Sequence, residues 1–107
     1  MNYGLSENTL ERLTGVFKAF PEVESVVIYG SRAKGNFKPG SDIDLTLHGA
    51  SLTQSKCDEI AECIDELLLA YTVDLSIFAT INHPELEAHI ERVGLELYRK
   101  ASMPEIS

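Results

Sequence analysis

Residues 30–44 read GSRAKGNFKPGSDID, and this stretch decides how the rest of the chain is interpreted. A glycine–serine pair follows a run of β-branched residues, a glycine-rich basic loop comes next, and two aspartates then stand two positions apart. Successive side chains of a strand point to opposite faces, so Asp42 and Asp44 leave the same face. The stretch therefore predicts a strand, a turn suited to phosphate groups, and a second strand that carries paired carboxylates.

Composition indicates a single globular domain. The chain has 107 residues, of which 44% are hydrophobic and 24% are charged, enough for one modest core. We expect the domain to span residues 1–107, with a core over about 6–98 and a tail over 99–107. No segment approaches the roughly 20 apolar residues of a membrane span, and the N-terminus lacks the pattern of a signal peptide. We therefore expect a cytoplasmic protein that does not bind membranes.

The charge distribution separates two kinds of ligand. A formal net charge of −8 argues against stable binding of nucleic acid, because phosphate backbones are bound through Lys and Arg. Three of the nine basic residues nevertheless fall within seven positions of one loop, namely Arg32, Lys34 and Lys38. A local positive loop in an acidic chain fits a small polyphosphate.

Hydrophobic periodicity predicts the order helix, strand, strand, helix, strand, helix. The expected ranges are a helix over 6–20, strands over 23–29 and 41–48, a helix after the capping signal at 51–54 with an apolar stripe as far as Tyr71, a strand over 73–77, a helix over 84–93, and a short strand or extended tail over 95–98. This order is typical of an α/β (α+β) fold. We expect a small mixed β-sheet with helices packed on one face.

A third aspartate extends the candidate site. Asp74 alternates with Val73 and Leu75, so it lies on the polar face of the next predicted strand. If the two strands are neighbours, three carboxylates converge, and at about 4 Å each like-charged pair costs on the order of 4 kcal/mol at an effective dielectric near 20. Such a cluster shares protons or binds a cation. Oxygen ligands without His or Cys favour Mg²⁺.

The glycine–serine turn complements that metal site. Magnesium held by carboxylates usually takes further ligands from substrate phosphates. Gly30 allows close approach of the backbone, and the hydroxyl and amides at Ser31 can donate hydrogen bonds to phosphate oxygens. Arg32 and Lys34 add positive charge. Either feature alone is common in proteins of other function, whereas the combination is far more specific.

The chain resembles the minimal nucleotidyltransferases of the DNA polymerase β superfamily. Their signature is Gly-Ser, ten residues, Asp-x-Asp, and Gly30-Ser31 with Asp42-Ile43-Asp44 match it without departure in spacing. The resemblance covers roughly residues 8–98 and implies the polymerase-β-like nucleotidyltransferase fold. It also implies that Gly30 and Ser31 hold a nucleoside triphosphate, that Asp42 and Asp44 bind metal, and that Asp74, assigned by position, completes the site or accepts a proton.

The resemblance further implies a reaction and a partner. Stand-alone members of this size pair with a helical HEPN protein, and in toxin–antitoxin systems they add AMP to that toxin. We therefore expect an adenylyltransferase that uses ATP and two Mg²⁺ ions and acts as an antitoxin, in a homodimer or hetero-oligomer. Two alternatives stay open: an antitoxin that masks its partner without turnover, and an enzyme that modifies a small molecule such as an antibiotic hydroxyl.

The remaining polar and aromatic candidates have simpler interpretations. Phe37 could stack on a base or anchor the loop. We expect His48, His83 and His89 to be surface or capping residues, although His48 follows the polar face of its strand. We interpret Tyr29, directly before the Gly-Ser turn, as a packing residue.

Overall fold

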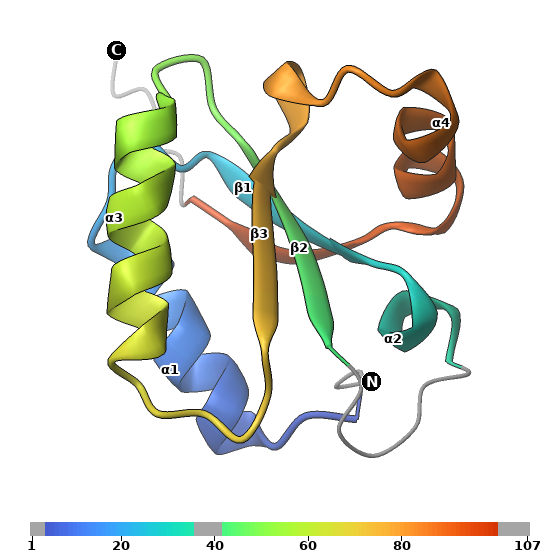
Figure 1. The fold of residues 1–107 in the computed structure, drawn as a ribbon. Helices are drawn as coiled ribbons and strands as arrows, with labels where there is room; N and C mark the ends of the chain where they lie inside the picture. The colour runs from blue at the N-terminus through green and yellow to red at the C-terminus, as the bar shows by residue number, and fades with distance from the viewer. Residues whose placement is uncertain (1–3, 36–41, 101–107) are drawn as a thin grey trace, which may run out of the picture.

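The elements of the computed structural model follow the predicted order. The structure describes residues 4–35 and 42–100 (Figure 1). Its elements are α1 (Glu7–Lys18), β1 (Ser25–Tyr29), α2 (Ser31–Lys34), β2 (Ile43–His48), α3 (Gln54–Asp65), β3 (Val73–Ile77), the 3-10 helix η1 (Phe78–Thr80), α4 (Pro84–Val93) and β4 (Leu95–Arg99). The expected mixed α/β fold is confirmed, and the segment after α4 is a strand that includes Arg99.

The four strands form one mixed sheet in the order β3-β2-β1-β4. Strand β1 is antiparallel to β2 and to β4, whereas β2 and β3 are parallel. Antiparallel strands can be joined by a short connection, but parallel strands require a crossover, which α3 supplies here. The predicted neighbourhood of the two aspartate-bearing strands is therefore confirmed.

The main core lies between the sheet and two helices. Ile43, Leu45 and Leu47 alternate along β2 and are fully buried, together with Val26 and Ile28 of β1. Helices α1 and α3 lie side by side over this face (Figure 1). Their buried residues complete the cluster: Leu13 and Phe17 from α1, and Cys57, Ile60 and Ile64 from α3. Burying each large aliphatic side chain contributes roughly 1.5–3 kcal/mol, so this face supplies most of the stability.

The expectation that all helices pack on one face holds for α1 and α3 but not for α2 and α4. Figure 1 shows α2 and α4 on the opposite side of the sheet. Val27 and Tyr29 alternate with the core residues of β1 and so face α4. A Cβ atom at Gly94 would lie 2.6 Å from Cγ1 of Val27, so the end of α4 approaches β1 closely. The sequence did not predict this because β1 is apolar on both faces.

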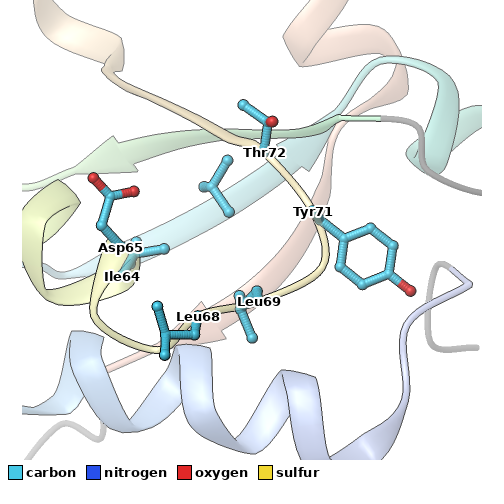
Figure 2. A pocket seen from close by; sticks show the side chains of 7 residues that line it. Ile64, Asp65, Leu68, Leu69, Tyr71 and Thr72 are labelled. Atoms are coloured by element: carbon cyan, nitrogen blue, oxygen red, sulfur yellow. The ribbon is translucent and has the colours of Figure 1, made fainter.

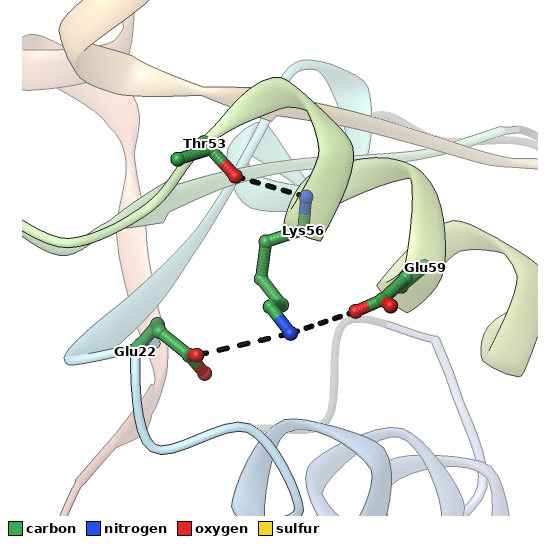
Figure 3. Close-up of polar contacts among 4 residues, drawn as sticks. All are labelled: Glu22, Thr53, Lys56 and Glu59. Carbon is green, nitrogen blue, oxygen red and sulfur yellow. Dashed lines mark hydrogen bonds and ion pairs between the residues drawn. The ribbon is translucent and has the colours of Figure 1, made fainter.

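Local capping and ion pairs fix the helix starts. The Ser6 hydroxyl accepts a hydrogen bond from the Thr9 amide at 3.1 Å, which confirms Ser6 as the N-cap of α1. Thr53 caps α3 in the same way, through the Lys56 amide. The Lys56 ammonium lies 2.8 Å from Glu59 and 3.8 Å from Glu22 (Figure 3). Such partly exposed pairs contribute at most about 1 kcal/mol each, so they orient α3 more than they stabilise it.

The end of α3 differs from the sequence prediction. The apolar stripe continues to Tyr71, yet the helix ends at Asp65, and Leu68 has a φ of 54° and is 87% exposed. The 12 residues of α3 span about 18 Å, which matches the roughly 20 Å of the six-residue strand β2. A helix that continued to Tyr71 would overshoot the point where a parallel β3 must begin. The Arg12 guanidinium donates to the Leu67 carbonyl and holds the returning segment against α1.

Two glycine substitutions test the packing of α4. Gly94→Ala should destabilise the protein by roughly 1–3 kcal/mol because the added methyl overlaps Val27 and the Ile90 carbonyl. Gly15→Ala is the matched control, since no atom lies within 4 Å of its Cβ position. In the middle of α1 it should stabilise by about 0.5–1 kcal/mol. Urea unfolding measures both, and a neutral Gly94→Ala would contradict the close contact of α4 with β1.

Candidate active site

The parallel pairing of β2 and β3 brings two of the predicted carboxylates together. Asp44 and Asp74 are direct register partners, and such partners on adjacent strands project from the same face about 4.8 Å apart. Asp44 is half-buried and Asp74 is exposed. Asp42 precedes β2 by one residue and is exposed, so it lies at the entrance of the same face.

The electrostatics of the site disfavour an uncompensated carboxylate. Burial raises the pKa of Asp44 above its ordinary value, and the charges of Asp74 and then Asp42 raise it further. The imidazole of His89 acts in the opposite direction on the same pKa. A carboxylate held in this way gains from a cation or a proton. The fold thus keeps negative charge concentrated where a positively charged ligand would relieve it.

The glycine–serine turn lies against the same carboxylate. Gly30 has φ 76° and ψ −154°, a conformation that is essentially restricted to glycine. A Cβ atom at this position would lie 2.4 Å from Oδ2 of Asp44, so any other residue here would displace the Asp44 carboxylate. Gly30 therefore joins the two halves of the motif, and Ser31 follows as the first residue of α2.

The two described basic residues of the turn differ in burial: Arg32 is buried and Lys34 is exposed. Arg32 is 1% exposed, and its guanidinium carbon lies 4.8 Å from the centroid of the Tyr71 ring. Its position is that of an anchor for the turn, through a cation–π contact. Lys34 is exposed at the end of α2 and is available to a ligand. Phe37 and Lys38 lie outside the described residues.

Tyr29, expected to be a packing residue, and His89, expected to be a surface or capping residue, both lie close to Asp44. Tyr29 is 8% exposed, pairs with Asp44 across the β1–β2 ladder, and meets the His89 ring edge-on at 6.4 Å. Burial raises the pKa of Tyr29, a side-chain hydrogen bond with Ser76 lowers it, and Asp44 and Asp74 raise it. The alternation of β1 places Tyr29 on the same face as Val27, opposite the main core, and this was the one signal in the sequence. The sequence did not show that Tyr29 pairs with Asp44 across the sheet.

The other two histidines have structural positions. The ring of His48 stacks on Phe78 with 4.8 Å between the ring centroids, four residues beyond Asp44 on β2. Nδ1 of His83 accepts a hydrogen bond from the Leu86 amide at 3.1 Å and caps α4. The capping interpretation of His83 is confirmed.

The donor set fits a hard cation that arrives with a phosphate ligand. Among the described residues, no three His, Cys, Asp or Glu side chains are grouped closely enough to form a metal centre on their own. Mg²⁺ in nucleotide enzymes usually takes one or two carboxylates and completes its shell with phosphates and water. The carboxylates of Asp44 and Asp74, which are register partners on adjacent strands, satisfy that requirement.

Comparison with known proteins identifies a family for most of the chain. The family model described as Polymerase beta, Nucleotidyltransferase matches residues 11–102. Among curated proteins, none matches this sequence.

Three solved structures illustrate the similarity in fold. A chain of a toxin–antitoxin complex with AMP-PNP is 24% identical, with a TM-score of 0.68 over 90% of this chain and 75% of that chain. A chain from a complex of a tri-AMPylated HEPN toxin of Shewanella oneidensis with an MNT antitoxin is 17% identical, with a TM-score of 0.66 over 90% and 74%. A candidate nucleotidyltransferase of Sulfolobus solfataricus is 16% identical, with a TM-score of 0.52 over 91% and 92%.

Substitution of Gly30 should damage both the fold and the site. Gly30→Ala forces a methyl group into Oδ2 of Asp44 at a positive φ, and we expect a loss of roughly 2–4 kcal/mol of stability together with loss of nucleotide binding. Gly35→Ala is the control, since Gly35 also has a positive φ (84°) but no atom of another described residue within 4 Å of its Cβ position. It should cost only about 1 kcal/mol and keep binding. Denaturant unfolding and nucleotide titration measure the two effects, and equal losses in both variants would contradict the close contact.

Removal of the Asp44 charge should stabilise the protein without metal. Because the folded-state pKa of Asp44 is raised above its unfolded value, ionisation costs folding free energy above the folded pKa. This cost disappears as the pH falls below the unfolded pKa. Asp44→Asn should therefore raise the melting temperature by about 1–3 °C near neutral pH and have no effect in strong acid.

Asp58→Asn controls for the general loss of one negative charge from an acidic chain, because Asp58 lies on the exposed side of α3. Thermal scans across pH in the presence of a chelator provide the measurement. Equal melting shifts for the two variants would show that the carboxylate cluster carries no special cost.

Proposed function

Since the chain belongs to the polymerase β nucleotidyltransferase family, we propose that it transfers AMP from ATP to a hydroxyl of a HEPN-type toxin and so acts as an antitoxin. The observation that carries this proposal is the meeting of Asp44 and Asp74 on one face, directly against the Gly30–Ser31 turn. A triphosphate needs both a cradle for its oxygens and carboxylates that hold its metal ions, and this face combines them.

The similar structures support the choice of donor and acceptor. One toxin–antitoxin complex contains AMP-PNP, an analogue of ATP, and another contains a tri-AMPylated HEPN toxin with its MNT antitoxin. The chain spans about three-quarters of the chains that it matches in these complexes. Its fold therefore supplies most of the corresponding domain.

The residues of the chain divide the work of binding. The Gly30 backbone allows a phosphate to approach, the Ser31 hydroxyl donates a hydrogen bond to it, and Lys34 adds positive charge. Arg32 supports the turn from inside. Asp42, Asp44 and Asp74 would hold two Mg²⁺ ions, which neutralise charge on the triphosphate and its leaving group when bound.

The proposed chemistry is an in-line displacement at phosphorus. The acceptor oxygen attacks the α-phosphorus, a new oxygen–phosphorus bond forms, and the bond between the α-phosphorus and the bridging oxygen breaks to release pyrophosphate. The hydroxyl proton passes to a carboxylate, and we assign this role to Asp74 because it is the exposed member of the pair. Asp44 is less accessible and is better placed for binding.

A cytoplasmic location is part of the proposal. ATP and a toxin made in the same cell are both found in that compartment. Over residues 4–35 and 42–100, no helix combines the length and the apolar character needed to cross a membrane.

The proposal is tested by transfer of label from α-labelled ATP to a HEPN-type partner in the presence of Mg²⁺. The double variant Asp42→Asn with Asp44→Asn should reduce transfer by a factor of about 100 or more, because it removes charge that acts on the metal ions and the transition state. The variant should retain the circular dichroism of the wild type, since both side chains leave the apolar face untouched. Asp58→Asn, a surface change on α3, should transfer AMP at the wild-type rate.

The outcomes separate three functions. Absence of label transfer by the wild type with every nucleoside triphosphate would overturn the proposal. Protection of cells from the toxin by the double variant would instead show that masking carries the function. Labelling of a small-molecule hydroxyl, with no labelling of the protein partner, would favour the small-molecule enzyme.

A further inference from the structure

Strand β3 forms one edge of the described sheet, and this edge carries Asp74. The Ile43 amide donates to the Thr72 carbonyl at 2.9 Å. In a parallel pair this pattern repeats every second residue, so the backbone groups of Asp74 and Ser76 point toward β2. The amides and carbonyls of Val73 and Leu75 consequently point outward, away from the sheet.

Two cavities lie along this edge on the face opposite Asp74. One has a volume of about 250 Å³ and is lined by residues from the end of α3 to the start of β3, among them Leu68 and Tyr71 (Figure 2). The other has a volume of about 140 Å³ and is lined by residues that include Ala61 and Leu75. Ile64, Asp65 and Val73 line both cavities, so the two adjoin between α3 and β3, and together they are called the groove.

Because side chains alternate along β3, the side chains of a strand added at its edge would alternate between the groove and the face that carries Asp74. Val73 and Leu75 face the groove, whereas Asp74 and Ser76 face the candidate site. A residue placed directly opposite Asp74 on a new strand would share the face of Asp74, about 4.8 Å away. Its two neighbours along the chain would point into the groove.

We propose that the outer edge of β3 binds an extended segment of the partner toxin as a fifth strand, with the acceptor hydroxyl opposite Asp74 and apolar side chains in the groove. This inference rests on the proposed function and specifies how its acceptor is held. Strand addition of this kind obtains affinity from main-chain hydrogen bonds and specificity from pockets for alternate side chains. The acceptor oxygen then loses its proton to Asp74 as it forms the bond to the α-phosphorus and pyrophosphate departs.

The charge of the groove and of the whole chain favours a toxin segment over a second copy of this chain. Asp65 is exposed and lines both cavities. A segment with Lys or Arg beside its apolar residues complements this carboxylate. A second copy would bring the same carboxylate and a net charge of −8 against it. The 87% exposed Leu68 adds an apolar contact at the end of the groove.

The opposite edge of the sheet lacks these features. On β4, Arg99 forms two hydrogen bonds with the Glu96 carboxylate, at 2.9 and 2.6 Å. Charged pairs on an outer strand are a common protection against strand addition. Strand β4 is also separated from Asp74 by β1 and β2. An acceptor bound there would not reach the carboxylates.

Amide hydrogen exchange measured by NMR tests the site of docking. The HEPN-type partner protein is added to the Asp42→Asn, Asp44→Asn double variant, so that binding is observed without turnover. Exchange of the Leu75 amide should slow by about tenfold or more, while the Ser76 amide, already bonded to β2, should change little.

The other outcomes overturn either this inference or the proposed function on which it rests. No binding of the partner, or protection confined to surfaces other than β3, excludes the added strand. Protection of Leu75 that grows with the concentration of this chain alone assigns the edge to a second copy. Protection of Leu75 by the partner, combined with absence of label transfer by the wild type, would keep the docking site and reject the proposed transfer.

A charge reversal provides a matched kinetic test. Asp65→Lys should raise the KM for the partner protein by about tenfold and leave the KM for ATP unchanged, because it reverses the charge of the groove but not of the nucleotide site. Lysine in the last turn of α3 is favourable for the helix, so the fold should be retained. Asp58→Lys, on the exposed first half of the same helix, should leave both values unchanged. Equal effects of the two variants would contradict docking in the groove.

Discussion

The parallel register of β2 and β3 is the constraint on which the site depends. It places Asp44 directly beside Asp74, and it exists only because α3 returns the chain to the start of β2. The opposing repulsion is on the order of 4 kcal/mol for a pair at about 4 Å and an effective dielectric near 20. Each of the buried side chains Ile43, Leu45 and Leu47 contributes roughly 1.5–3 kcal/mol on the other face. The core can therefore hold the carboxylates together without a metal.

Gly30 connects the glycine–serine turn to this pair of carboxylates. Its conformation brings the backbone to the carboxylate of Asp44, which any added side chain at Gly30 would displace. Arg32 then reaches into the interior and lies over Tyr71, just before β3. The short segment from Gly30 to Arg32 therefore contacts Asp44 on β2 and Tyr71 just before β3. The charge repulsion and the backbone strain thus occur at the same place, as is common at functional sites. A cationic ligand bound there would relieve the repulsion.

The sequence predicted the parts of the fold that local chemistry determines. The spacing of Gly30, Ser31, Asp42 and Asp44 indicated the motif, and the alternation of Asp74 placed it on the correct face. The side of the sheet on which α4 packs was not predictable, because β1 is apolar on both faces. The burial of Arg32 was not predictable either, since a basic residue in a glycine-rich loop has the same sequence pattern whether it binds a ligand or anchors the loop.

The end of α3 shows most plainly how tertiary structure overrides periodicity, and it links the fold to the proposed acceptor site. The apolar stripe past Asp65 satisfies the helical pattern, but the distance back to β3 requires the helix to stop. The residues released from the helix, with Leu68 the most exposed, then line a groove that a longer helix would have filled. Because β3 alternates, the strand that borders this groove also presents Asp74 on its other face. In the proposed arrangement, acceptor binding and proton transfer therefore share the five residues of one edge strand.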